Sequence, residues 1–182
     1  MRTAVVACAL ALGACATVPS PAPTVAPEPA ADAAFDASGR LSAKRGSEGA
    51  AANFDWAHAP DRDAIALSTP MGTTLARLER DAGGATLLRP DRPPERASDV
   101  ATLADRVLAL PVPVERLAWW IRGVPHPGSA HAIERDAAGR ASVLRQDGWA
   151  IVYSYAGDAA RPRVIFASYP ELEVRVVVDA WR

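Results

Sequence analysis

Cysteine is nearly absent from this chain of 182 residues: there are two, Cys8 and Cys15, and none follows residue 15. A disulfide framework and a cysteine-based metal site are therefore excluded from the rest of the chain. An excess of one charge is lacking too, because the formal net charge is -1 and the basic residues are scattered. This balance excludes the electrostatic footprint of a nucleic-acid-binding protein.

Catalytic spacings are also lacking. The three histidines, His58, His126 and His131, have no partner at metal-ligand spacing and are predicted to be surface or loop residues. No G-x-S-x-G sequence places a nucleophilic serine on a strand-to-helix turn, and no phosphate-binding loop joins a strand to a helix. The sequence therefore favours a protein that is not an enzyme and that uses no cofactor and no metal.

Long hydrophobic runs are missing as well. The apolar run at residues 4–12 is shorter than the about 20 residues that span a bilayer. It follows Arg2 and precedes small residues, which is typical of a secretory signal peptide, here residues 1–14. Residues 12–15, LGAC, resemble a bacterial lipobox, so Cys15 is expected to become the lipid-modified first residue. The alternative is an ordinary signal peptide with an incidental cysteine.

The segment after the signal peptide is rich in alanine and proline. Residues 16–34 contain five prolines and no apolar period, which predicts a semi-extended tether of at most about 3 Å per residue. Residues 15–34 would thus form a lipidated tether that holds a folded body off a membrane. Ala16 after the cysteine, rather than aspartate, indicates the outer membrane by the sorting rule of bacterial lipoproteins.

Short alternating runs occupy both ends of the body predicted for residues 35–182. Clusters of Gly, Pro and Asp separate these runs, which is typical of antiparallel strands. The predicted strands are residues 39–44, 51–58, 62–68, 73–80, 83–90, 131–136, 141–147, 149–156, 163–168 and 172–181.

Two helices are predicted between the strands. Residues 98–110 have apolar residues at helical spacing, with Ser98 as the expected N-cap. Residues 113–123 form the second helix, which Gly123 ends. The apolar stripes are Val100, Leu103, Val107 and Leu108 in the first helix, and Leu117, Trp120 and Ile121 in the second. Trp119 lies off this stripe and fits either a cavity rim or an exposed contact.

The order of strands, two helices and strands predicts a mainly β fold of the α+β class. A sheet of about ten strands has an apolar face to bury, and two short helices cannot cover all of it. The sequence therefore favours a curved sheet wrapped around the helices, with room for an apolar cavity between them.

One turn is unexpectedly apolar. The stretch STPMG, residues 68–72, connects two predicted strands, and Pro70 and Gly72 suffice to make a tight turn. Met71 between them either folds back into the core or stands exposed at the tip, and the residues by themselves allow both.

Six motifs follow one another along the body. They are GRLS at 39–42, NFDW at 53–56, LSTPMG at 67–72, LPVPVERLAWWIRGVP at 110–125, RQDGWAIVY at 145–153 and VVVDAW at 176–181. Each motif is weak alone, but the ordered set is fairly specific. With them the chain resembles the LolB family, the outer-membrane lipoproteins that receive other lipoproteins from the periplasmic carrier LolA.

The resemblance implies an incomplete antiparallel β-barrel with helices covering its open side and an internal hydrophobic cavity. It implies that the protein binds the acyl chains of client lipoproteins brought by the carrier and inserts them into the outer-membrane bilayer. The family works without a cofactor or ATP, and a monomer is expected.

The resemblance also implies particular site residues. The family's protruding loop with an exposed apolar residue falls on Pro70, Met71 and Gly72, and methionine in place of leucine keeps size and apolarity. The acyl-chain cavity is predicted where apolar strand faces meet the helical stripes, with ordinary core packing as the alternative for each residue. The predicted lining is Phe54, Trp56, Ile65, Leu67, Leu103, Val107, Leu117 and Ile121.

Two other functions stay open on the sequence. One is a structural or interaction lipoprotein of the envelope, whose hairpin docks a partner protein. The other is a barrel that binds a different amphiphile. In the first alternative Met71 contacts a partner protein, whereas in the family role it contacts lipid.

Overall fold

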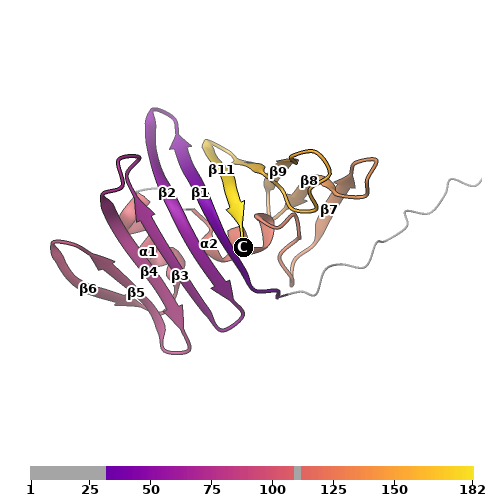
Figure 1. The fold of residues 1–182 in the computed structure, drawn as a ribbon. Coiled ribbons are helices and arrows are strands. Elements are labelled where there is room, and N and C mark those ends of the chain that lie inside the picture. Colours follow the sequence, from indigo (N-terminus) through magenta and orange to yellow (C-terminus); the bar gives the residue numbers. More distant parts are fainter. Residues whose placement is uncertain (1–31, 109–111) are drawn as a thin grey trace, which may run out of the picture.

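The structure is a computed structural model that describes residues 32–108 and 112–182 (Figure 1). The described strands are β1 Phe35–Arg45, β2 Glu48–Ala59, β3 Arg62–Ser68, β4 Thr74–Asp81, β5 Gly84–Arg89, β6 Arg92–Ala97, β7 His131–Arg135, β8 Ala141–Gln146, β9 Trp149–Ser154, β10 Val164–Tyr169 and β11 Leu172–Trp181. The described helices are α1 Val100–Leu108 and α2 Val114–Trp120. The predicted signal peptide, Cys15 and most of the predicted tether lie outside the described residues.

The strands form one antiparallel sheet in the order β6-β5-β4-β3-β2-β1-β11-β10-β9-β8-β7. The first and last strands meet in its middle, because β1 pairs with β2 on one side and with β11 on the other. The two edges, β6 and β7, do not pair with each other, so the sheet is not closed. The predicted mainly β fold with an unclosed antiparallel sheet is thereby confirmed.

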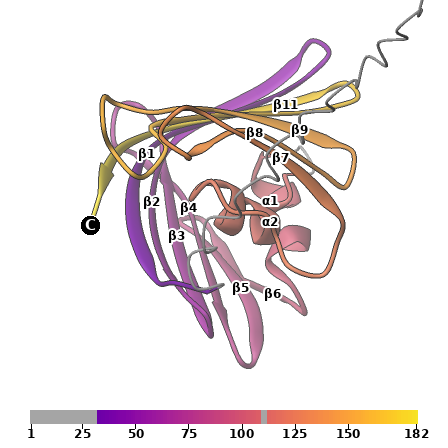
Figure 2. The ribbon, with the colours of Figure 1, turned by 90° about the vertical axis from the view of Figure 1, so that its right-hand side faces the viewer.

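Both helices lie on the concave side of the curved sheet (Figure 2). They connect its two edges, since the chain leaves β6, forms α1 and α2 and then enters β7. α1 packs against β4, β5, β6 and α2. The apolar faces of the strands and the apolar stripes of the helices therefore form one core, in which Trp120 is fully buried.

The edge strand β6 was not predicted from the sequence. Its sequence RPPERA contains Pro93 and Pro94. Proline has no backbone N–H to donate to a β-ladder, so two adjacent prolines argue against a strand in the sequence. An edge strand tolerates proline on its unpaired side. The two prolines also make this edge a poor template for pairing with another chain.

The helix ends follow local chemistry, with one correction. The predicted N-cap Ser98 is wrong: Asp99 Oδ1 accepts the hydrogen bond from the Thr102 backbone N–H at 2.8 Å, and the Ser98 hydroxyl only donates to Asp99. The predicted stop at Gly123 is confirmed. Gly123 has φ +77°, and its N–H donates to the Trp120 carbonyl, as in a Schellman motif.

Candidate functional site

The loop between β3 and β4 is held by its own hydrogen bonds. The Gly72 N–H donates to the Thr69 carbonyl at 2.9 Å, and the Thr69 N–H donates to the Thr73 carbonyl at 2.8 Å. Gly72 has φ +85°, a backbone conformation that glycine adopts at low cost. Asn53 Nδ2 on the neighbouring β2 donates to the same Thr69 carbonyl at 3.2 Å. The turn is thus fixed both internally and to the sheet.

Met71 is at the tip of this turn and is 93% exposed. The hydrogen bonds at Thr69, Gly72 and Thr73 stabilise the turn in which the methionine side chain points into solvent. Of the two positions that the sequence allowed for Met71, the structure shows the exposed one.

An all-apolar pocket lies between the sheet and the helices. Its lining residues are Leu41, Phe54, Trp56, Ile65, Leu67, Leu78, Ala104, Val112, Val114, Leu117, Ile121 and Val176. They come from strands β1 to β4 and β11, from both helices and from the segment before α2. Two of them, Ile65 and Leu67, lie on β3, the strand that leads directly to Met71.

Six of the eight predicted lining residues face this pocket. Leu103 and Val107 do not: Leu103 is fully buried in the core, and Val107 is half-buried against it. The sequence did not predict the lining from β1, β4 and β11, which is Leu41, Leu78 and Val176, or that from the helical region, which is Ala104, Val112 and Val114. The alternating pattern of β11 already carried the signal for Val176.

The pocket is small, with a volume of about 30 Å³. That is the space of roughly one water molecule. The structure therefore describes a state in which the helices are packed onto the sheet.

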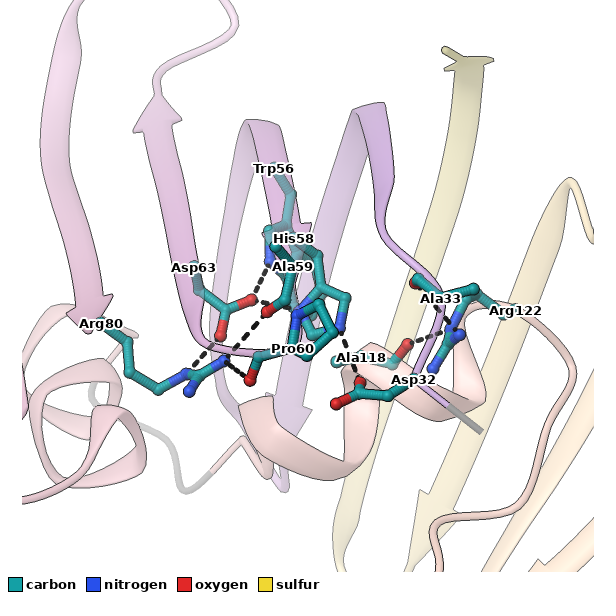
Figure 3. A network of polar contacts seen from close by, with 10 residues as sticks. All are labelled: Asp32, Ala33, Trp56, His58, Ala59, Pro60, Asp63, Arg80, Ala118 and Arg122. Atoms are coloured by element: carbon teal, nitrogen blue, oxygen red, sulfur yellow. Dashed lines mark hydrogen bonds and ion pairs between the residues drawn. The ribbon is translucent and has the colours of Figure 1, made fainter. Parts of the chain in front are cut away.

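A cluster of polar side chains lies where β2 and β3 turn into each other (Figure 3). Asp63 is at its centre: Oδ1 accepts a hydrogen bond from Trp56 Nε1 at 2.8 Å and lies 2.6 Å from His58 Nδ1. Asp63 Oδ2 accepts one from Arg80 Nε at 2.5 Å. Trp56 thus contributes its ring to the pocket and its N–H to this cluster.

The prediction of a surface or loop position was wrong for His58. His58 is only 7% exposed, and its ring stacks on Phe35 with the ring centroids 4.8 Å apart. Burial raises the pKa of Asp63, but the hydrogen bonds from His58, Trp56 and Arg80 outweigh it and hold that pKa below its ordinary value. The cluster is therefore built around an ionised carboxylate.

The segment before β1 is attached to the end of α2. The Arg122 guanidinium donates to the Ala33 carbonyl at 3.2 Å and to the Ala118 carbonyl at 3.0 Å (Figure 3). It also lies over the Trp119 ring, 4.9 Å from the centroid. Trp119, whose position the sequence left open, is half-buried and packs against the core.

Ion pairs attach both helices to the sheet. Glu95 on β6 binds Arg106 of α1 at 2.8 Å with one oxygen and Arg89 of β5 with the other. Arg116 of α2 binds Asp147, in the turn between β8 and β9. These contacts lie near the surface, so each contributes little to stability on its own.

Within residues 32–108 and 112–182, no three His, Cys, Asp or Glu side chains gather closely enough to hold a metal ion. Neither helix in that part of the chain combines the length and the apolar character needed to cross a membrane.

Comparison with known proteins gives a consistent result. The family model for the outer membrane lipoprotein LolB matches residues 33–181. The chain is 40% identical over 183 residues to the outer-membrane lipoprotein LolB of Chromobacterium violaceum, covering 100% of this chain and 98% of that protein. It is 40% identical over 182 residues to the LolB of Thiobacillus denitrificans, covering 100% and 97%. A solved LolA superfamily protein from Nitrosomonas europaea overlays with a TM-score of 0.48 at 7% identity, over 82% of this chain and 85% of that one.

The sequence matches include every motif on which the resemblance depends, from residues 39–42 to residues 176–181. The predicted family and the predicted outer-membrane location are confirmed. The chain belongs to the LolB family of outer-membrane lipoproteins, and its role is to receive lipoproteins at that membrane and insert them into it.

Proposed function

We propose that this protein binds acyl chains between its sheet and the two helices, and releases them into the bilayer at the Met71 loop. The observation that carries the proposal is the position of Met71. It is 93% exposed on a rigid turn, four residues after Leu67, which lines the apolar pocket. One strand, β3, therefore connects the lining of the pocket to the apolar tip.

The energetics fit such a transfer. Each buried CH₂ contributes about 0.8 kcal/mol, so an acyl chain exposed to water costs on the order of 10 kcal/mol. Insertion of one methionine into lipid gains roughly 1.5–3 kcal/mol. That gain is too small to anchor the protein but large enough to orient it. The lipid on Cys15 would anchor the protein, and residues 16–34 would let the folded body extend from the membrane.

The helices act as the cover of the cavity in this proposal. A pocket of about 30 Å³ has no room for an acyl chain, so α1 and α2 move away from the sheet when a chain enters. The chain then passes from a LolA-like carrier into an apolar space without contact with water. No catalytic step, cofactor or energy source is needed, and one monomer suffices.

The proposal predicts that Met71→Glu stops insertion while the protein stays folded. A carboxylate at the tip is repelled by the hydrocarbon region, so the rate of lipoprotein insertion into vesicles is expected to fall by about tenfold or more. The measurement loads the carrier with a labelled lipoprotein and follows its arrival in vesicles that contain the anchored protein.

Met71→Leu is the matched control and should insert at the wild-type rate. The Glu variant should still remove the lipoprotein from the carrier, because the pocket is unchanged. Normal insertion by Met71→Glu would show that the loop is not the exit. Loss of the handover itself would favour the alternative in which the hairpin docks a protein partner.

Weakening the α1 attachment is expected to open the cavity. Glu95→Ala removes the contacts to Arg106 and Arg89, so a fluorescent fatty acid should enter about threefold faster. Stopped-flow fluorescence measures this rate, and Glu48→Ala, at an exposed carboxylate at the start of β2, should leave it unchanged. An unchanged rate in Glu95→Ala would mean that α1 does not move during entry.

A further inference from the structure

A groove lies on the outer face of the sheet next to the Met71 loop. It holds about 190 Å³ and is lined by Arg40, Leu41, Ser42, Ala51, Ala52, Asn53, Pro70, Arg175 and Val177. It opens on the face of the sheet opposite the acyl pocket, because Ser42 and Ala51 are exposed there, and Leu41 lies between the two cavities and lines both. Pro70, which immediately precedes Met71, forms one wall.

The groove exists because two small residues, Ser42 and Ala51, lie opposite each other on β1 and β2. Ser42 of β1 is paired with Ala51 of β2 on one side and with Arg175 of β11 on the other. The floor of the groove is therefore formed by the Ser42 hydroxyl and the Ala51 methyl group. Arg175 and Pro70 form its walls. Asn53, which lines the groove, also holds the loop through the Thr69 carbonyl at 3.2 Å.

The charge of the groove is positive. Arg40 pairs with Asp179 at 3.2 Å, so its charge is compensated. Arg175 is exposed, and its guanidinium has neither an ion-pair nor a hydrogen-bond partner among the described residues. The nearest carboxylate on the same face of its strand is Glu173, and the positively charged Lys44 lies opposite Glu173 on β1. One uncompensated guanidinium thus remains at the groove, beside the Ser42 hydroxyl.

We infer that this groove binds the phosphate of a phospholipid headgroup when Met71 enters the bilayer. A guanidinium offers two parallel N–H donors that match a phosphate, and a serine hydroxyl adds a third donor. If Met71 reaches the hydrocarbon region, the groove behind Pro70 lies at the level of the headgroups. This inference rests on the proposed role of the Met71 loop and adds a polar contact to it.

The test titrates the full lipidated protein, in a maltoside detergent that contains no phosphate, with short-chain phosphatidylglycerol. Backbone NMR signals of Ser42 and Ala51 are expected to shift and saturate. Arg175→Gln should raise the dissociation constant about fivefold, the effect of one arginine near an anionic lipid. Arg163→Gln is the matched control, because Arg163 is exposed but does not line the groove, and its dissociation constant should equal that of the wild type.

A second titration uses inorganic phosphate, which should not shift these signals at the concentrations at which the lipid saturates. Equal binding of free phosphate would overturn the headgroup assignment, as would absent shifts at Ser42 and Ala51 or wild-type binding by Arg175→Gln. None of these results depends on transfer. If Met71→Glu blocks insertion while the groove binds no lipid, the headgroup site is refuted and the exit role of the loop stands. If the groove binds lipid while Met71→Glu inserts normally, the exit role is refuted, and the lipid site stands without it.

Discussion

Gly39→Ala is expected to destabilise the protein more than any other single methyl group added to its sheet. Gly39 lies on β1 at a shift in register, and a Cβ there would be 2.0 Å from the Val177 carbonyl oxygen of β11. The obstacle is backbone, so no side-chain rotation relieves it. The two strands have to separate at this point to admit the methyl group.

The consequence is large because this strand pair joins the two halves of the sheet. Strands β2 to β6 reach strands β11 to β7 only through β1. We expect a loss of about 4 kcal/mol or more, and a melting temperature lower by about 10 °C or more. Thermal unfolding followed by circular dichroism measures both.

Gly49→Ala is the matched control. A Cβ at Gly49 would meet the Ala43 carbonyl oxygen at 3.5 Å, which is ordinary van der Waals contact, and Gly49 is also on a strand paired with β1. This variant should melt within about 2 °C of the wild type. If Gly39→Ala were equally stable, the close approach of β1 and β11 would not be a constraint on the fold.

The second large effect is expected at the polar cluster. Asp63→Ala leaves the buried Trp56 N–H and the buried His58 ring without their shared partner, at a cost of about 1–3 kcal/mol for each. Arg80 is partly exposed and can turn into solvent, so its charge adds less. A total loss of about 3–5 kcal/mol is expected in urea unfolding, while Asp61→Ala, at an exposed carboxylate in the adjacent turn, should change little.

The same carboxylate makes stability depend on pH. The pKa of Asp63 is lower in the folded protein than its ordinary value, so folding is favoured by this group above the unfolded pKa. The contribution disappears as the pH falls through the lower, folded pKa. Acid unfolding of Asp63→Ala should therefore lack the part of the pH dependence that the wild type shows in this range. Identical acid profiles would mean that the carboxylate is not stabilised by the cluster.

The polar cluster and the Met71 loop give the pocket two different ends. At one end Trp56 is held by Asp63 and the segment before β1 is attached to Arg122, while at the other β3 runs into the exposed tip. A hydrogen-bonded end and an apolar, protruding end fit the proposed passage of acyl chains toward the Met71 loop.

Local sequence patterns were sufficient to predict most of the strands and one helix end. Alternation predicted ten of the strands because a strand exposes its faces with a period of two, and Gly123 predicted a helix end because of its backbone freedom. Where the local sequence was compatible with two structures, the prediction was wrong or left both open. Asp99, and not Ser98, caps α1, and β6 was not predicted because it contains two prolines.

The amino-acid sequence by itself determined the family, the strand-helix-strand order and the position of an apolar turn. The tertiary structure decided which way Met71 points, that His58 is buried, and that Arg175, Ser42 and Pro70 share a groove. The physical reason is that periodicity specifies the face on which a side chain lies, whereas the neighbours on that face depend on strand order and register. These are set by pairing between residues as distant in sequence as Ser42 and Arg175.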